Sequence, residues 1–512
     1  MQGGIMKKTY FMALLILVAA AALTGCKGGT KENEKDSVTV GITQDLDSLD
    51  PHKAVAAGTK EVLYNLFEGL VKPDQAGNLV PAVAESYQIS DDGQTYTFVL
   101  RKNVKFHNGN TVTAEDVVYS LKRCAGMLET SDPEVQVVAA LSVISDITAS
   151  NENGADIITI TLNTPNTELI GYLTCSIIPK GYNDQKTNPV GTGPFRFVSY
   201  TPMNSFVMER FKDYYGDQAN LEEVKFVISE STDAAFLKLQ AGDIDIFPYL
   251  TVDQSNQLKD KYSIEIGEMS LVQGLFLNNK VEPFNKKEVR QAINYAIDKD
   301  EILTMLNGGG GKKIGSGVYA GFTAYFNESC VDTYPYNPEK AKELLRNAGY
   351  PDGFTFTCTV PSNYTYHVQT AEIIASQLKK IGVTMKIQTV EWASWLSDVY
   401  HDHNHEATII GLDSQLAPSD ILKYYISGSA KNFINYESEA FDAAYREAVA
   451  TTDTAKKKEL YNKAQQCLAD DAASVFLQSP SLMVAVRNGY AGYKFYPVYV
   501  QDMQSVYKVK SK

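Results

Sequence analysis

Short segments rich in β-branched and aromatic residues alternate with segments of helical periodicity along almost the whole chain after residue 37. Such alternation predicts mixed sheets covered by helices, which is the α/β class. A chain of 512 residues can bury one or more full hydrophobic cores, and its length predicts two to three domains. We therefore expect several α/β units, each built around its own sheet.

Individual elements follow from the same periodicities. Strands are expected at residues 38–40, 95–101, 222–228, 271–277, 354–360, 384–390, 407–411 and 482–487. Helices are expected at residues 60–70, 114–123, 232–241, 287–305, 338–348, 370–381 and 455–469. One helix start is sharply marked, because Thr113 precedes the acidic residues Glu115 and Asp116 and can cap the first turn.

The first residues form a targeting segment that is separate from the fold. An apolar run at residues 10–23 follows two lysines and is too short to span a membrane comfortably. The run ends in the letters LTGC, which resemble the bacterial lipobox and make Cys26 the expected lipid-attachment residue. We expect residues 1–25 to be a lipoprotein signal peptide and residues 26–37 a flexible tether, so that lipid holds the protein on the extracytoplasmic face of the cell membrane. The alternative is a plain secretory signal with an incidental cysteine.

Composition and missing motifs argue against several functions. Acidic residues outnumber basic ones, 61 to 47, and the net charge of -14 disfavours nucleic acid as a partner. The cysteines after Cys26 form no C-x-x-C pair, so neither a zinc site nor a particular disulfide is expected. Because the chain also lacks G-x-S-x-G and H-E-x-x-H motifs, we expect no enzymatic activity, no catalytic residues and no cofactor, and a secreted hydrolase is the least favoured function.

A series of short motifs follows a fixed order along the chain. They include SLDPH at residues 48–52, LFEGL at 66–70, AESY at 84–87, FVLR at 98–101, FHNG at 106–109, AEDVVYS at 114–120, PVGTGPF at 189–195, LQAGDID at 239–245, VRQAINYAID at 289–298, AGYPDGF at 348–354 and VEW at 390–392. In this order and spacing the chain resembles the peptide/nickel-type (family 5) extracellular solute-binding proteins of ABC importers. That group includes oligopeptide, dipeptide and nickel binders, and the resemblance covers nearly the whole chain after the tether.

The resemblance implies a periplasmic-binding-protein-like fold of type II, in which two lobes joined by a hinge close on a ligand. It implies a lobe I made of residues 38–72, 190–279 and 487–512, a small inserted domain at residues 73–189, and a lobe II at residues 280–486. The two hinge crossings are then expected near Asn278–Asn279 and near Val486–Arg487.

The implied function is capture of a peptide between the lobes and delivery to the permease subunits of an ABC transporter by a monomeric protein. The alternative keeps this fold and changes the ligand to a metal chelate such as a nickel complex, an opine or a small glycan.

Two neighbouring residues compete for the main ligand contact. In peptide-binding members of the family, an Asp shortly before a proline pairs with the amino terminus of the ligand. Counting back from Pro418 without a gap puts Ser414 at this position, whereas a gap of one residue puts Asp413 there. A carboxylate in a water-excluded site needs a cationic partner, so both residues remain ligand-binding candidates.

Four further ligand-binding candidates come from the resemblance. Trp392 matches a pocket-lining aromatic residue, with packing inside a lobe as the alternative. Asp45 and Leu46 lie where members of the family offer a strand edge to an extended ligand, and Gln273 lies on the expected crossing strand.

The run from His401 to His405 contains three histidines at alternate positions, which would share one face of a strand and could bind a metal. A solvated loop is the favoured interpretation of this run, so we expect no metal site.

Overall fold

The structure is a computed structural model that describes residues 36–509, except residues 130–131, 259, 363 and 415. The expected signal peptide, Cys26 and residues 26–35 of the expected tether lie outside the described residues.

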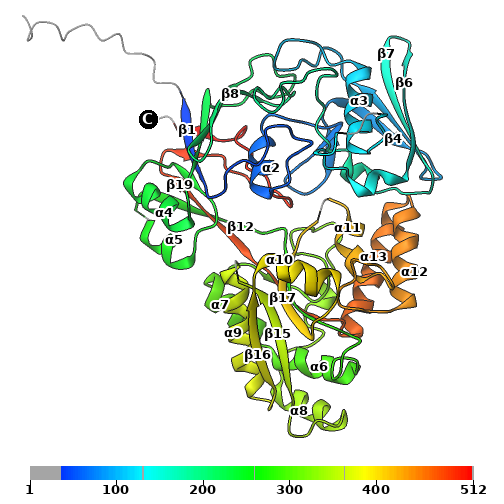
Figure 1. Ribbon diagram of the computed structural model, residues 1–512, viewed down its shortest axis with the longest axis vertical. Coiled ribbons are helices and arrows are strands. Elements are labelled where there is room, and N and C mark those ends of the chain that lie inside the picture. Colours follow the sequence, from blue (N-terminus) through cyan, green and yellow to red (C-terminus); the bar gives the residue numbers. More distant parts are fainter. Residues whose placement is uncertain (1–35, 130–131, 259, 363, 415, 510–512) are drawn as a thin grey trace, which may run out of the picture. The chain divides into compact units, whose positions relative to one another are not determined.

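The first large sheet has seven strands and defines lobe I (Figure 1). Its order is β12 (Tyr262–Glu268), β19 (Ser481–Arg487), β11 (Ile246–Phe247), β1 (Ser37–Ile42), β10 (Glu223–Ile228), β9 (Ser205–Arg210) and β8 (Phe195–Thr201). The central strand β1 runs parallel to β10 and β11. Its valines Val38 and Val40 alternate with polar positions and pack in one core with Phe206 and Phe226.

The second large sheet has six strands and defines lobe II. Its order is β14 (Lys312–Lys313), β18 (Val475–Ser479), β13 (Val272–Leu277), β17 (Ala407–Leu412), β15 (Thr355–Pro361) and β16 (Thr384–Val390). Every residue of β13 is buried, because Leu275 and Leu277 enter one core while Val272 and Phe276 enter another. Burial on both faces explains why this strand has an almost continuous apolar sequence.

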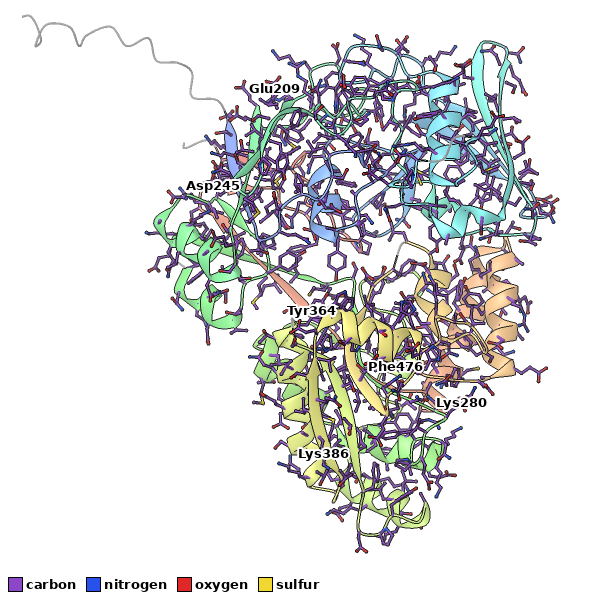
Figure 2. All side chains as sticks on the ribbon, in the orientation of Figure 1. Glu209, Asp245, Lys280, Tyr364, Lys386 and Phe476 are labelled. Carbon is purple, nitrogen blue, oxygen red and sulfur yellow. The ribbon has the colours of Figure 1, made fainter. Side chains whose placement is uncertain are left out.

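Helices cover both faces of the lobe II sheet. One core contains residues of α6 (Lys287–Ala296), α7 (Lys299–Asn307), α8 (Pro338–Asn347) and α9 (Thr365–Lys379). The other contains residues of α11 (Pro418–Leu422), α12 (Glu439–Ala450) and α13 (Thr454–Asp470). Phe476 of β18 belongs to this second core, and its position in lobe II is labelled in Figure 2.

A smaller antiparallel sheet lies within residues 73–189. Its order is β4 (Ala84–Ile89), β5 (Thr95–Leu100), β7 (Ala155–Leu162) and β6 (Ile144–Glu152), and α3 (Ala114–Cys124) packs on it. The Thr113 side chain accepts a bond from Asp116 N at 3.2 Å, and Asp116 Oδ2 accepts from Thr113 N at 2.9 Å. The expected Thr113 cap is therefore confirmed as a reciprocal capping box.

The remaining named elements are short or lie at the edges of these units. They are α2 (Ala57–Leu63), β2 (Val71–Pro73), β3 (Leu79–Pro81), α4 (Thr232–Ala241), α5 (Val252–Leu258), α10 (Trp392–Ser394), β20 (Tyr490–Ala491), β21 (Tyr507–Lys508), a π-helix η4 (Trp395–His401) and four 3-10 segments, η1 (Ala139–Val143), η2 (Leu169–Tyr172), η3 (Glu328–Cys330) and η5 (Lys423–Tyr425).

The two chain crossings lie at different residues from those that the sequence predicts. The chain leaves the lobe I sheet after β12 and enters the lobe II sheet at β13, so this crossing is at residues 269–271 and not near Asn278–Asn279. It returns between β18 and β19, so the second crossing is at Pro480 and not near Val486–Arg487. The position expected near Asn278–Asn279 lies beyond the end of β13, and the position expected near Val486–Arg487 lies at the end of β19. The expected lobe boundaries therefore place β13 in lobe I and β19 in lobe II, whereas β13 belongs to the lobe II sheet and β19 to the lobe I sheet. Met269 N donates to Pro480 O at 2.9 Å, so the two crossings are hydrogen-bonded to each other.

Two expected helices have different bounds. α2 ends at Leu63, before the expected end at residue 70, because the Asn65 side chain donates to Val62 O and to Gln501 O and draws the chain into a turn. The expected helix 287–305 is two helices, because Ile297 is extended and the Asp298 side chain accepts from Asp300 N and Glu301 N to start α7.

Candidate functional site

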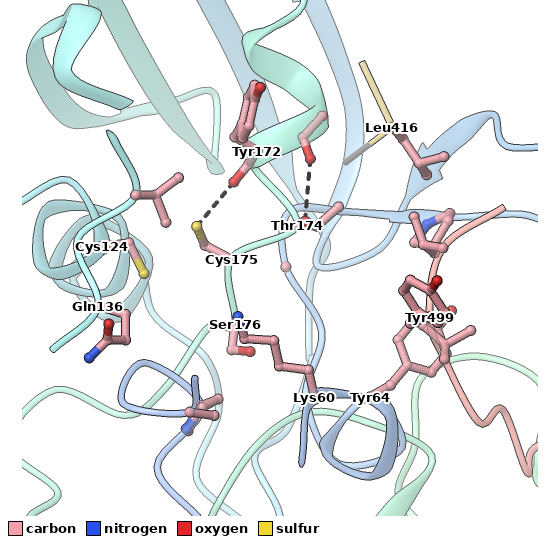
Figure 3. Close-up of a pocket in the computed structure, with 18 of the residues that line it drawn as sticks. Lys60, Tyr64, Cys124, Gln136, Tyr172, Thr174, Cys175, Ser176, Leu416 and Tyr499 are labelled. Atoms are coloured by element: carbon pink, nitrogen blue, oxygen red, sulfur yellow. Dashed lines mark hydrogen bonds between the residues drawn. The ribbon is translucent and has the colours of Figure 1, made fainter. Parts of the chain in front are cut away.

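A cavity of about 620 Å³ lies between lobe I and lobe II. Its lining comes from residues in the ranges 51–73, 124–140, 171–176, 413–431 and 498–500, and Figure 3 shows part of it. A solute in this cavity would contact both lobes, because α2 packs in the lobe I core and α11 in the lobe II core. Its size and position are typical of a small-molecule site.

Asp413 and Ser414 both line this cavity, directly after β17. Among the described residues, no ion pair joins the Asp413 carboxylate. Although Asp413 is exposed to the solvent of the cavity, loss of part of its water to the surrounding protein raises the pKa of its carboxyl, and Asp420 acts in the same direction. Lys423 and Lys60 only partly oppose this shift, so the site still favours a cationic group beside Asp413.

The other carboxylates of the cavity wall are already paired within the protein. Glu68 accepts from Lys72 Nζ at 2.8 Å and from the hydroxyls of Tyr214 and Tyr215 at 2.7 and 2.6 Å. Asp420 accepts from Tyr172 OH at 2.8 Å and forms an ion pair with Lys423. These carboxylates are compensated before any ligand arrives, which distinguishes them from Asp413.

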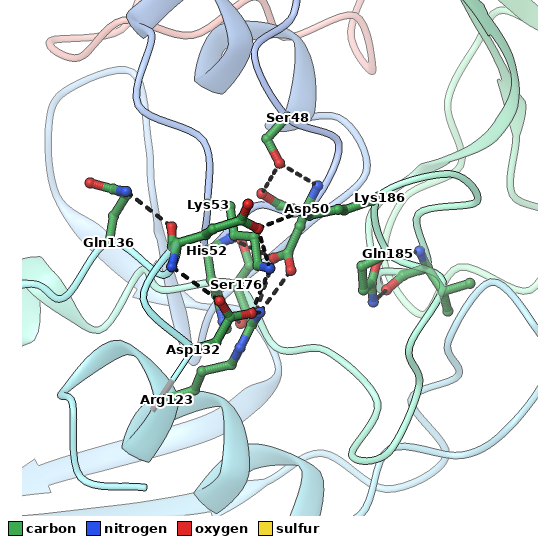
Figure 4. Close-up of polar contacts among 12 residues, drawn as sticks. Ser48, Asp50, His52, Lys53, Arg123, Asp132, Gln136, Ser176, Gln185 and Lys186 are labelled. Carbon is green, nitrogen blue, oxygen red and sulfur yellow. Dashed lines mark hydrogen bonds and ion pairs between the residues drawn. The ribbon is translucent and has the colours of Figure 1, made fainter. Parts of the chain in front are cut away.

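A polar network holds one wall of the cavity in place (Figure 4). Arg123, near the C-terminus of α3, donates to both Asp50 oxygens at 3.0 and 2.8 Å. Although burial acts in the opposite direction, this guanidinium lowers the pKa of Asp50. The Asp50 carboxylate also accepts from His52 N at 3.0 Å, and His52 Nε2 lies 2.8 Å from Ser176 O. The SLDPH motif thus fixes the position of Ser176, which lines the cavity.

Several cavity residues have no signal in the sequence. Lys60, Tyr64, Ser176 and Tyr499 line the cavity, although they come from three distant segments of the chain. The helical pattern places Lys60 on an amphipathic helix but cannot show what the exposed face of that helix meets. Only the tertiary fold brings these side chains to one cavity.

The other four candidates lie away from this cavity. Gln273 is fully buried, and its amide contacts His367 Nδ1 at 2.9 Å, Thr370 Oγ1 at 3.0 Å and Gln478 Nε2 at 2.7 Å. This conformation leaves the Gln273 side chain no contact with the cavity, because its hydrogen bonds are made inside lobe II.

Asp45 and Leu46 are also engaged within lobe I. Asp45 accepts from Tyr200 OH at 2.8 Å and from Met203 N at 3.1 Å. Leu46 is buried in the core under the seven-stranded sheet. Neither lines the cavity.

Trp392 is neither in the cavity lining nor buried in the lobe. Its ring stacks on Trp395 at 5.1 Å between centroids and meets the edge of Tyr364 at 5.5 Å. Tyr364 is labelled in Figure 2 at the end of lobe II nearest lobe I. With 36% of its surface exposed, Trp392 forms part of a small aromatic surface there.

The histidine run is not a uniformly solvated loop. His401 is exposed, whereas His405 is buried, and burial lowers the pKa of His405 to about 4. His401 is the last residue of the π-helix η4, whereas His403 and His405 follow it, so the three imidazoles do not share a strand face. The described part of the chain contains no group of three or more His, Cys, Asp or Glu side chains placed to hold a metal.

Comparison with known proteins gives consistent matches over this same chain. Residues 78–433 match the model of the bacterial extracellular solute-binding proteins, family 5 Middle. The dipeptide-binding protein of Escherichia coli (strain K12) is 26% identical over 97% of this chain and 96% of its own length. Heme-binding protein A of Haemophilus influenzae is 29% identical over 81% of this chain and 80% of its own length.

A solved structure shows the same fold. The ABC transporter-associated periplasmic binding protein DppA from Helicobacter pylori, in complex with peptide STSA, is 28% identical and superposes with a TM-score of 0.76. The match covers 94% of this chain and 100% of that chain. It confirms the expected two-lobed α/β fold.

In the part of the chain that the structure describes, no helix has the length and apolar character needed to cross a bilayer. The matching family consists of substrate-binding proteins. The family model covers more than half of the chain, so the chain belongs to the bacterial extracellular solute-binding proteins of family 5.

Proposed function

We propose that this protein captures peptides in the cavity between its lobes and delivers them, as a monomer, to the permease subunits of an ABC importer. The observation that carries the proposal is the Asp413 carboxylate, which lines the cavity without an ion pair among the described residues. A peptide ammonium would supply the missing cation through a charge-assisted hydrogen bond. Similarity to a dipeptide-binding protein and to a protein solved with a bound peptide supports the same ligand class.

Isothermal titration of the purified protein with trialanine and with N-acetyl-trialanine tests this proposal. We expect the free-amine peptide to bind more tightly, and Asp413→Asn to remove the difference by weakening trialanine about 10-fold or more. Ser414→Ala tests the competing candidate, which lines the same cavity without a charge, and should leave the preference for the free-amine peptide unchanged. If no peptide in a short-peptide library binds while another solute class does, the proposal is wrong.

The second candidate ligand is a non-peptide solute, such as a metal chelate, an opine or a small glycan. One observation favours keeping it, since a relative at 29% identity carries the name heme-binding protein. Native mass spectrometry of protein purified from its own host would identify a retained solute by mass and separate the two ligand classes.

We also propose that lipid on Cys26 holds the protein at the extracytoplasmic face of the membrane, after removal of residues 1–25. The sequence LTGC and the preceding apolar run support this arrangement. Replacing Cys26 by Ser should move the protein from the membrane fraction to the soluble fraction. Equal membrane attachment of the two forms would contradict lipid attachment at Cys26.

A further inference from the structure

Two residues that line the cavity are cysteines from distant parts of the chain. Cys124 is the last residue of α3, and Cys175 follows the end of η2 by three residues. Both line the cavity, and both are free thiols in this structure. Their spacing matches no cysteine motif, so the fold alone brings them to the same wall.

One face of α3 runs along the segment that contains Cys175. Ser120 and Cys124 share this face, because they are four residues apart in the helix. Ser120 Oγ accepts from Ile178 N at 2.9 Å and donates to Ile178 O at 3.2 Å. One turn earlier, Asp116 Oδ1 accepts from a backbone N–H further along the same segment at 2.7 Å. Continued by one turn in the other direction, this register brings Cys175 opposite Cys124.

The two thiols meet between α3 and this segment. The pKa of the buried Cys124 thiol is raised well above its usual value, and contact with the Cys175 thiol is the largest cause, followed by burial. For Cys330, Cys358 and Cys467 the largest cause of a raised thiol pKa is burial. Figure 3 shows the Cys124 and Cys175 side chains at the same part of the cavity wall. Thiol–thiol contact thus distinguishes this pair from the other described cysteines.

Cys175 is the more accessible member of the pair. It is half-buried, whereas only 3% of Cys124 is exposed. Cys175 Sγ donates to Tyr172 O at 3.0 Å, which holds the thiol at the cavity wall. The chain belongs to a family of extracellular proteins, and thiols outside the cytoplasm meet oxidising disulfides. A small disulfide that enters the cavity therefore reaches Cys175 first.

We propose that Cys124 and Cys175 form a redox site, which a small-molecule disulfide such as oxidised glutathione converts to an intramolecular disulfide bond. The Cys175 thiolate attacks one sulfur of the small disulfide, which forms a mixed disulfide and releases one thiolate. The Cys124 thiolate then attacks the Cys175 sulfur and releases the second thiolate. The protein pair is oxidised, the small disulfide is reduced, and the two protons of the protein thiols end on the two released thiols.

The bond has a consequence for the cavity wall. It joins the end of α3 to the segment that carries Thr174, Cys175 and Ser176 into the cavity lining. Because it closes the long loop between the two cysteines, it restricts the unfolded chain and stabilises the folded protein. The oxidised protein should therefore unfold at a higher urea concentration than the reduced protein.

Mass spectrometry after cleavage at glutamate tests the redox site. The purified protein is reduced with dithiothreitol, desalted and incubated with oxidised glutathione without denaturant, and the remaining thiols are blocked with iodoacetamide. Glu152 and Glu168 lie between the two cysteines, so only a disulfide keeps the two cysteine peptides joined after cleavage. We expect nearly all of the wild-type protein to yield the joined peptides.

Variants separate the two steps of the reaction. Cys124→Ser should stop at a glutathione adduct on Cys175, whereas Cys175→Ser should leave the buried Cys124 unmodified. Cys467→Ser is the matched control, because Cys467 is half-buried like Cys175 but does not line the cavity, and this variant should form the bond as the wild type does. Wild-type peptides that stay separate, with or without a glutathione adduct, would overturn the proposal. Joining of either cysteine to Cys330 or Cys467 would overturn it as well.

Discussion

At the scale of single residues, the cavity wall depends on buried charges that are balanced inside the protein. Asp50 is 4% exposed, and it is paired with Arg123 across the junction between the SLDPH segment and α3. Such a pair adds little net stability compared with apolar residues, but breaking it leaves an isolated charge without water. The pair therefore fixes the geometry of the wall rather than supplying the free energy of folding.

Arg123→Met should lower the free energy of unfolding by about 3 kcal/mol, because it leaves the Asp50 carboxylate buried and unpaired. The double variant Asp50→Asn with Arg123→Met should recover much of this loss, since it removes both charges. Urea denaturation followed by circular dichroism measures both effects. A single variant as stable as the wild type would show that Asp50 reaches solvent or another cation.

Buried histidines give the protein a pH-dependent stability. Burial lowers the pKa of His52, His107, His367 and His405 from 6.5 to about 4. Between these values the unfolded chain binds more protons than the folded protein, so the free energy of unfolding increases with pH. This contribution is complete above pH 6.5 and is lost as the pH falls toward 4.

We expect the free energy of unfolding, measured by urea titration at several pH values, to fall between pH 6.5 and pH 5. His405→Phe should reduce the slope, because His405 titrates in this range on unfolding and makes no ring hydrogen bond among the described residues. His401→Gln is the control, since His401 is exposed. A flat profile in the wild-type protein would contradict burial of these imidazoles.

At the scale of elements, caps decide where helices begin and side-chain bonds decide where they stop. The capping box at Thr113 starts α3, and the Asp298 cap starts α7 after a break in the expected helix 287–305. Apolar periodicity alone continues through that break, because Ile293, Ile297 and Ile302 are all buried in the same core. The apolar periodicity therefore predicted the helical region but did not show the break between α6 and α7.

Thr113→Ala should destabilise the protein by about 1 kcal/mol, since it removes the acceptor for Asp116 N at the start of α3. Thr113→Ser keeps the hydroxyl and should restore most of the stability. Thermal unfolding of the three proteins side by side provides the measurement. Equal loss in both variants would mean that the methyl group, rather than the cap, is the important contact.

At the scale of the whole molecule, the lobes are joined by the two crossings and also by a contact on the far side of the cavity. Glu168, within residues 73–189, accepts from Tyr461 OH at 2.5 Å and from Ser419 N at 3.0 Å. Lys457 Nζ lies 3.8 Å from the same carboxylate. Tyr461 lies in α13 and Ser419 in α11, which are helices of lobe II, so the Glu168 carboxylate stabilises the arrangement in which the lobes meet.

Glu168→Ala should shift the protein toward separated lobes and weaken trialanine binding about 10-fold, because it removes contacts made only when the lobes meet. Glu168 does not line the cavity, so a direct effect on the ligand is not expected. Small-angle scattering with and without peptide measures the change in radius of gyration. Tyr461→Phe removes one of the bonds and should give a smaller effect. Unchanged affinity and unchanged scattering in Glu168→Ala would contradict this role.

Much of the fold could be predicted because its signals are local or carried by ordered motifs. Strands β13, β15, β16 and β17 lie within a residue or two of their expected bounds, since burial imposes an apolar pattern that can be read along the chain. The expected crossings were misplaced because a strand has the same apolar pattern whichever of the two sheets it joins. Hydrogen-bonded pairing, and not periodicity, determines that β13 and β19 belong to different sheets.

The sequence by itself determined the α/β class, the family through its ordered motifs, and the candidates Asp413 and Ser414 a few residues before Pro418. Only the tertiary structure decided that Lys60 and Ser176 line the same cavity as Asp413, while Gln273 is enclosed in lobe II. The physical reason is the separation along the chain between the residues that produce each feature. Helix caps and strand patterns arise from neighbours in the chain, whereas an uncompensated charge is defined by all the groups that folding brings around it.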